Sequence, residues 1–190
     1  MQADRFERVE VHSQQELWAW LEAHHQQAES VWLVTWKAAH PKYYVSREQV
    51  LDALIAFGWI DGRRMKLDAH KTMQLISPRK QQAWAKSYKE RASRLEKQGL
   101  MKPSGEATVL NAKASGSWEK MTEVDELVVP DDLGKALRQN KATKWWTTAA
   151  PSYRRNVLRW IASAKKAETR SNRVQEVAQL AAVGEKVPHY

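Results

Sequence analysis

Residues 46–67 read SREQVLDALIAFGWIDGRRMKL and combine a helix, a stop and a strand in one run. Ser46 and Gln49 have the spacing of a capping box, in which both side chains satisfy N–H groups at a helix start. The inward positions then recur at helical spacing: Val50, Leu51, Leu54, Ile55 and Phe57. Gly58 is the residue type that ends helices, and residues 59–67 follow as a strand. The run predicts a helix packed on a sheet.

Strands and helices alternate before this run. Residues 6–11 and 30–37 read as strands, and a second capping box, Ser13 with Glu16, opens a helix between them. In residues 30–37, apolar side chains occupy both alternating faces, which indicates a strand that is covered on both sides.

The elements after the run complete the N-terminal part. Residues 72–76 can pair with residues 59–67 across a turn, and a basic helix is expected beyond Pro78, ending at Gly99. Its apolar stripe is Trp84, Tyr88, Ala92 and Leu95. A short helix over residues 104–114 follows. This order predicts an α+β fold, with a small mixed sheet and packed helices.

The remaining residues change character. Residues 117–131 are acidic, with Lys120 as the one basic residue, and we expect a linker there. Helices are expected from Asp131/Asp132, around Trp145-Trp146, from Pro151, and up to Gly184. The domain prediction is therefore an α+β domain over residues 1–116, an acidic linker over 117–131 and a helical annex over 132–190.

Composition excludes several classes of protein. The chain has 190 residues, ten Trp and no Cys, so disulfides, Cys-ligated metals and thiol catalysis are excluded. The charged N-terminus lacks the apolar region of a signal peptide, and no apolar run approaches the ~20 residues of a membrane span. We expect a cytoplasmic protein whose Trp side chains are largely core or partly buried.

Positive charge is concentrated in residues 63–102. This segment holds twelve Lys and Arg residues against three acidic ones, an excess of nine that equals the formal net charge of +9 for the whole chain. A focused positive field attracts an anionic partner, whereas the same charge spread evenly mainly promotes solubility. The segment predicts an anionic small molecule or polyanion as partner.

The candidate anion-binding residues lie in and beside this segment: Trp59, Asp61, Arg63, Arg64, Arg79, Lys80 and Trp84. Arg79 follows a Pro that fixes the backbone, and its planar guanidinium suits phosphate or carboxylate. A solvated helix start is the alternative for Arg79 and Lys80. Asp61 is either a general base or a structural partner of Arg63 or Arg79.

Nucleic acid binding is a second interpretation. Trp84 and Tyr88 interleave with Lys86 and Lys89, which is compatible with phosphate contacts and base stacking. The C-terminal part adds three basic residues as further polyanion contacts: Arg154, Arg155 and Arg159. The aromatic residues fall on the apolar stripe, however, so burial competes with stacking.

Metal and cofactor motifs are absent from the sequence. The six His residues form no zinc-binding spacing, and the seven isolated Gly residues form no phosphate loop or dinucleotide fingerprint. We expect no metal and no cofactor. Trp145 and Trp146 point about 100° apart on a helix, so one of them could mark a homodimer contact.

The sequence resembles the YdeI/OmpD-associated (bacteriocin-protection, OmdA) family. The resemblance rests on residues 53–62 with the Ser77–Lys80 stretch and Trp84, and on residues 154–161 with 164–173. It extends over about residues 6–184. Family members often carry Cys where Ala56 stands and Asn where Tyr88 stands. The resemblance implies a bacterial protein associated with porin expression or with protection against bacteriocins and cationic peptides, and it supplies no catalytic residue.

Three functional hypotheses follow. The favoured one is a non-enzymatic stress-tolerance protein that holds an anionic ligand between the α+β domain and the helical annex. The second is a nucleic-acid-binding module. The third, an enzyme that uses Asp61, has the least support because neither a paired base nor a cofactor motif accompanies this residue.

Overall fold

The computed structural model describes residues 5–188 and divides the chain into two units, Met1–Glu119 and Lys120–Tyr190. The first unit contains four strands and four helices among its described residues, in this order: β1 (Arg8–Glu10), α1 (Gln14–His24), β2 (Val31–Trp36), α2 (Arg47–Ala56), β3 (Trp59–Lys66), β4 (Lys71–Pro78), α3 (Lys86–Lys97) and α4 (Pro103–Ala114). The predicted α+β class is confirmed.

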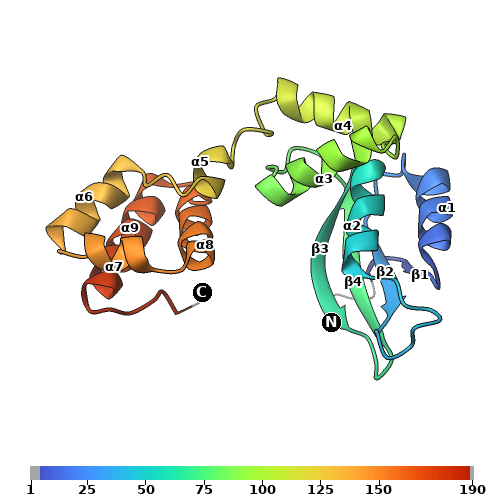
Figure 1. Ribbon diagram of the computed structural model, residues 1–190, viewed down its shortest axis with the longest axis horizontal. Helices are drawn as coiled ribbons and strands as arrows, with labels where there is room; N and C mark the ends of the chain where they lie inside the picture. Colours follow the sequence, from blue (N-terminus) through green and yellow to red (C-terminus); the bar gives the residue numbers. More distant parts are fainter. Residues whose placement is uncertain (1–4, 189–190) are drawn as a thin grey trace. The chain divides into compact units, whose positions relative to one another are not determined.

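The sheet of the first unit is mixed, as predicted. Its strand order is β1-β2-β4-β3, with β1 parallel to β2 and with β4 antiparallel to both β2 and β3. Figure 1 shows α1 and α2 beside this sheet, while α3 and α4 lie toward one end of it. The main core joins α1 and α2 to the inner strand face through Leu17, Leu21, Leu33, Leu54 and Ile76.

The opposite face of the sheet has a smaller cluster. Trp32, Val34 and Met73 are its buried members, and Met65 and Leu75 pack against them. Both faces of β2 are therefore buried, as its double apolar alternation predicts.

The two predicted capping boxes have different outcomes. In α2 the Ser46 hydroxyl accepts from Gln49 N at 3.2 Å, while Ser46 N donates to Gln49 Oε1 at 2.9 Å, so the box is complete. In α1 the Ser13 hydroxyl accepts from Glu16 N, but the Glu16 carboxylate accepts from His12 N instead. The box at α1 is half formed because the residue one position earlier offers its N–H.

The basic helix begins later than its charge pattern suggests. Residues 79–85 precede α3 without forming a helix, because Arg79 N continues the pairing of β4 by donating to Gly58 O at 2.9 Å. Trp84 is therefore buried from a loop, whereas Ala92 and Leu95 are buried from α3 itself. Gly58 ends α2 with a φ of 77°, a left-handed conformation that favours glycine.

The register of β3 shifts between Asp61 and Arg64. Asp61 lies opposite Ile76 and Arg64 opposite Gln74, so three steps on β3 match two steps on β4. Such a bulge reverses the alternation of side chains. Asp61 and Arg64 consequently share the helix-covered face, although a regular strand would place them on opposite faces.

The second unit is helical in its described residues. Its elements are α5 (Thr122–Asp125), α6 (Asp131–Gln139), α7 (Thr143–Thr148), α8 (Pro151–Ala162) and α9 (Ala167–Ala182). They share a core that includes Leu133, Val157, Ile161 and Val177. The segment expected as an acidic linker contains α5, and Val124 of α5 belongs to the same core.

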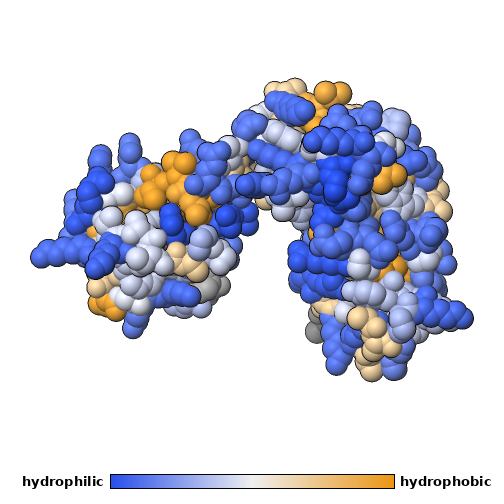
Figure 2. Space-filling view, in the orientation of Figure 1, coloured by the Kyte–Doolittle hydropathy of each residue, from blue (hydrophilic) through white to orange (hydrophobic). Residues whose placement is uncertain are grey.

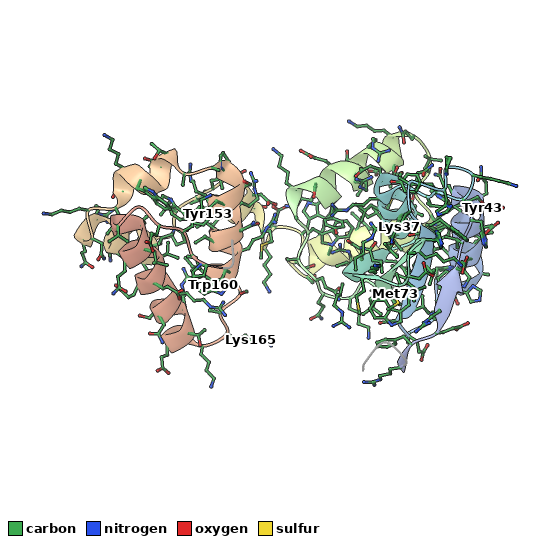
Figure 3. The ribbon with its side chains drawn as sticks, turned by 90° about the horizontal axis from the view of Figure 1, so that it is seen from below. Lys37, Tyr43, Met73, Tyr153, Trp160 and Lys165 are labelled. Atoms are coloured by element: carbon green, nitrogen blue, oxygen red, sulfur yellow. The ribbon has the colours of Figure 1, made fainter. Side chains whose placement is uncertain are left out.

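The adjacent residues Trp145 and Trp146 both belong to this second core. Trp146 is buried and Trp145 partly buried, and both rings lie edge-on to Tyr153, with centroids 5.9 and 6.3 Å away. Tyr153 lies among the helices of this unit (Figure 3). The two rings thus serve intramolecular packing, and no observation favours the homodimer contact.

Candidate functional site

Trp59 and Asp61 begin β3 and have structural partners. Trp59 is 1% exposed, and its indole N–H donates to His25 O at 3.2 Å. Asp61 accepts from Gln74 Nε2 at 3.1 Å with one oxygen and from the Tyr88 hydroxyl with the other. Its hydrogen-bond partners are therefore Gln74 and Tyr88, not Arg63 or Arg79. Burial, reinforced by the bond to Asp61, raises the pKa of Tyr88 to about 12.

Arg79 is the unusual residue of the candidate set. Its side chain is buried, with 7% relative exposure, although Arg is among the residues least often buried without a charged partner. Its Nη1 donates to the carbonyls of Gln82 and Ala83, both at 3.3 Å. The buried Nε has no hydrogen-bond partner, and among the described residues none accepts a bond from Nη2 or forms an ion pair with this side chain.

Aromatic rings hold the Arg79 guanidinium in place. Its Cζ lies 4.1 Å from the ring centroid of Trp84 and 5.2 Å from that of Tyr88, within the range of cation–π interactions. Burial lowers the pKa of Arg79 to about 10, while the nearby Tyr88 and Asp61 oppose this effect. Arg79 is still mostly protonated at neutral pH, so a positive charge is kept in a largely dry position.

A pocket of about 540 Å³ adjoins this charge. It is lined by residues of the loop after β4 and of the end of α4: Arg79, Lys80, Gln81, Asn111, Ala114 and Ser115. Lys80 is exposed, and its backbone N–H donates to the Gln82 side chain at 2.7 Å. All six residues belong to the first unit. Arg79, Lys80 and Trp84 are thus brought together, as the sequence placed them.

Arg63 and Arg64 diverge from that group and from each other. The Arg63 guanidinium lies over Trp32, 5.7 Å from the ring centroid, on the sheet face of the smaller cluster. Arg64 donates to the Thr72 hydroxyl at 3.0 Å. Neighbouring strand residues point to opposite faces, and the bulge in β3 places Arg64, not Arg63, on the face of Asp61. The expectation that both arginines join one anion site with Arg79 therefore has no support in the contacts.

Most of the remaining cations of the basic segment have acidic partners. Arg91 pairs with Glu48 and Asp52, and Arg94 reaches the same Asp52 carboxylate at 2.5 Å. Lys86 lies 3.8 Å from Glu90 and Lys89 lies 3.4 Å from Glu119. These pairs remove much of the positive field that the sequence concentrates in residues 63–102.

The predicted polyanion contacts of the second unit are also engaged. Arg155 and Arg159 approach Asp125 Oδ1 at 3.8 and 2.9 Å, and the Asp125 side chain is buried. Arg154 donates to Thr147 O at 3.4 Å and lies over Trp146. These residues organise the helical unit instead of forming a free basic surface.

Two site features could not be found from the sequence. Gln74 and Tyr88 are thirteen and twenty-seven residues from Asp61, and only the β3–β4 pairing and the packing of α3 bring them to it. Asn111 and Ser115 reach the Arg79 pocket from the end of α4. Within residues 5–188, no three His, Asp or Glu side chains are arranged to hold a metal, and no helix is long and apolar enough to cross a membrane.

Two family models match separate stretches of the chain. Residues 9–108, more than half of the chain, match the model described as Domain of unknown function (DUF8412). Residues 126–184 match the model described as Bacteriocin-protection, YdeI or OmpD-Associated, which confirms the resemblance for the C-terminal stretch. The N-terminal residues on which the resemblance also rested fall in the DUF8412 match instead. No curated protein and no solved structure matches the chain.

Proposed function

The chain belongs to the family described as Domain of unknown function (DUF8412), and its residues 126–184 match the Bacteriocin-protection, YdeI or OmpD-Associated model. From this premise and the geometry around Arg79, we propose that the N-terminal unit binds a small anion. The ligand contacts Arg79 in the pocket beside Lys80. The proposal is confined to the first unit, because every residue that lines this pocket belongs to it.

The buried Arg79 charge carries the proposal. Removing a cation from water costs several kcal/mol unless a counter-ion and hydrogen bonds compensate for it. Arg79 has two carbonyl acceptors and two aromatic rings, but no ion-pair partner among the described side chains. A bound anion supplies both the missing charge and acceptors for the remaining N–H groups.

The proposed role is non-enzymatic and supports tolerance of bacteriocins or related stress. The match of residues 126–184 to the bacteriocin-protection family supports the cellular role. Asp61 supports the non-catalytic reading, because both of its oxygens accept bonds from protein donors, Tyr88 and Gln74. Polyanion binding has less support, since Lys86, Lys89, Arg91 and Arg94 have acidic partners.

Titration calorimetry on the full chain tests the binding proposal, with acetate and inorganic phosphate as probes. The variant Arg79→Lys keeps the positive charge but removes the planar donor edge, and we expect at least ~10-fold weaker binding. Arg170→Lys is the matched control in the other unit and should bind as the unaltered protein does. The proposal fails if neither probe binds at millimolar concentration, or if Arg79→Lys leaves binding unchanged.

Survival of a bacterial host under bacteriocin exposure tests the cellular role. Cells that express the unaltered chain or Arg170→Lys should survive better than cells that express Arg79→Lys at the same level. If all three strains survive equally, anion binding at Arg79 does not contribute to protection, and the proposed cellular role fails.

A further inference from the structure

The orientation of the Arg79 guanidinium restricts which ligand group it can hold. Nη1 faces the backbone carbonyls of Gln82 and Ala83, which leaves the edge formed by Nε and Nη2. These two N–H groups point in nearly parallel directions and match two oxygens of one planar group. Nε is covered in this structure and Nη2 is not, so a ligand that occupies the whole edge must also displace the atoms that cover Nε. With both groups reached, Arg79 provides a bidentate edge and not a single point charge.

Arg170 shows in the same chain what this edge holds. Its Nε donates to Asp132 Oδ2 at 2.7 Å and its Nη2 donates to Asp132 Oδ1 at 3.0 Å. A carboxylate thus fills the Nε/Nη2 edge with both oxygens. The corresponding edge of Arg79 has no such partner among residues 5–188.

The surroundings of the pocket disfavour a dianion. Asn111, Ala114 and Ser115 lie at the C-terminal end of α4, where the helix dipole and the last carbonyl groups place partial negative charge. Asp61 adds a full negative charge close enough to Arg79 to raise its pKa. Among residues 5–188, Arg79 and Lys80 are the cations that line the pocket. This balance suits one negative charge on the ligand.

The pocket walls also favour a ligand with hydrogen-bond donors. The side-chain amides of Gln81 and Asn111 supply acceptor oxygens to the pocket, whereas the backbone carbonyls of Asn111, Ala112 and Lys113 already accept from protein donors. Within the described part of the chain, the side-chain amide of Asn111 forms no hydrogen bond, so it is available to a ligand. An apolar acid would leave the Asn111 amide without a partner.

We propose that the ligand of the Arg79 pocket is a small monocarboxylate with hydroxyl or amine donors, whose carboxylate spans Nε and Nη2 of Arg79 while its donors face Asn111 and the end of α4. The inference rests on the proposed anion-binding function and narrows it to one ligand chemistry. It places phosphate esters and polyanions outside the preferred class.

Nuclear magnetic resonance of the ¹⁵N-labelled full chain tests the inference through the Arg79 Nε–H signal. The signal is assigned by its disappearance in Arg79→Lys, and the carboxylate-bound Arg170 signal provides an internal reference. The probes are lactate, propionate, lactamide and methyl phosphate, which share a similar size but differ in charge and donors. Lactate should move the Arg79 signal toward the position of the Arg170 signal.

The expected order of affinity is lactate, then propionate and methyl phosphate, with no binding of lactamide. One hydrogen bond makes lactate about fivefold tighter than propionate. Asn111→Ala should reduce that preference toward unity while leaving propionate binding unchanged, an effect that a general loss of structure does not produce.

The outcomes separate the two proposals. If methyl phosphate binds more tightly than every carboxylate, the monocarboxylate inference is overturned and anion binding at Arg79 stands. If propionate equals lactate, the role of donors is overturned. If no probe moves the Arg79 signal while the Arg170 signal confirms a folded protein, both proposals fail.

Discussion

Arg79 in the first unit and Arg170 in the second present the same guanidinium edge in two different situations. Arg170 is partly exposed and its edge is filled by the Asp132 carboxylate. Arg79 is buried, stacked between aromatic rings, and has no carboxylate on its edge within the described chain. Stability alone explains the first arrangement but not the second. A charge that is kept at a cost in stability indicates function.

The two units also differ in how their charged side chains are partnered. In the second unit the buried Asp125 carboxylate is satisfied by Arg155 and Arg159, although the buried Nε of the partly exposed Arg154 has no hydrogen-bond partner. The first unit combines well-partnered cations, such as Arg91, with the exception at Arg79. Apolar surface does not separate the units, because Figure 2 shows apolar regions on both, and Leu110 and Val183 are 65% and 71% exposed. The exception at Arg79 makes the first unit the better candidate for ligand recognition.

The largest expected effect is a loss of stability that is confined to one unit. Trp84→Ala removes a ring that is 1% exposed and that stacks on Arg79, and we expect a loss of about 3–5 kcal/mol in the first unit. Hydrogen exchange should show reduced protection in α2 and α3 but not in α8 and α9, because the cores are distinct. Trp146→Ala is the matched variant and should give the reverse pattern. Equal loss of protection in both units would contradict the comparison.

The hydrogen bond behind Arg79 gives the next largest effect. Tyr88→Phe leaves Asp61 with Gln74 alone and should cost about 1.5–3 kcal/mol at pH 7, as for bonds to charged groups. Because the folded-state pKa of Tyr88 is about 12, above the ordinary 10.0, its contribution is complete below pH 10 and is lost as pH rises through about 12. Urea unfolding should show the difference from the unaltered chain shrinking over that range.

Tyr44→Phe is the matched control for this measurement. Tyr44 is 41% exposed, so removal of its hydroxyl should change the free energy of unfolding by less than about 0.5 kcal/mol, both at pH 7 and as the pH rises toward about 12. A similar effect of both substitutions would mean that the Asp61 bond contributes nothing specific.

Replacing Arg79 and replacing Arg170 should change the free energy of unfolding in opposite directions. Arg79→Met replaces a buried cation that has no ion-pair partner with an apolar side chain, and we expect the ligand-free protein to gain about 1 kcal/mol. Arg170→Met breaks an ion pair and should lose up to about 1 kcal/mol. Thermal unfolding of the two variants checks this. A loss of more than about 2 kcal/mol in Arg79→Met would assign that residue a structural role.

The smallest expected change in stability concerns the ion pair between Arg170 and Asp132. Arg170 lowers the pKa of Asp132, so the contribution of this pair is present above the ordinary value of 3.8 and is lost as pH falls through the lower folded-state value. Asp132→Asn should cost about 0.2–1 kcal/mol at neutral pH, because the pair is partly exposed. Chemical unfolding at pH 7 and below pH 3 should show the difference disappearing. A constant difference would mean that the charge is not responsible.

Local sequence signals predicted most of the elements for identifiable reasons. The capping box at Ser46, the stop at Gly58 and the Pro151 helix start depend on neighbouring residues alone, and each appears in the structure. The predicted start of the basic helix, directly after Pro78, was wrong. Arg79 N instead donates to Gly58 O and continues the strand pairing, and this contact joins residues twenty-one positions apart in the sequence. The charge of residues 63–102 did not predict the site, because acidic residues outside this segment neutralise part of it. Arg91, for example, pairs with Glu48 and Asp52.

The sequence by itself determined the α+β class, the helical C-terminal part, the family resemblance and the presence of Arg79 and Lys80 beside a Pro-fixed turn. These depend on local spacing and residue type. Tertiary structure alone decided that the β3 bulge places Arg64, not Arg63, on the face of Asp61, that Arg79 is buried without an ion-pair partner in the described chain, and that α4 completes its pocket. Burial and pairing are set by residues distant in sequence, and therefore only the folded chain reveals which of many cations remains available.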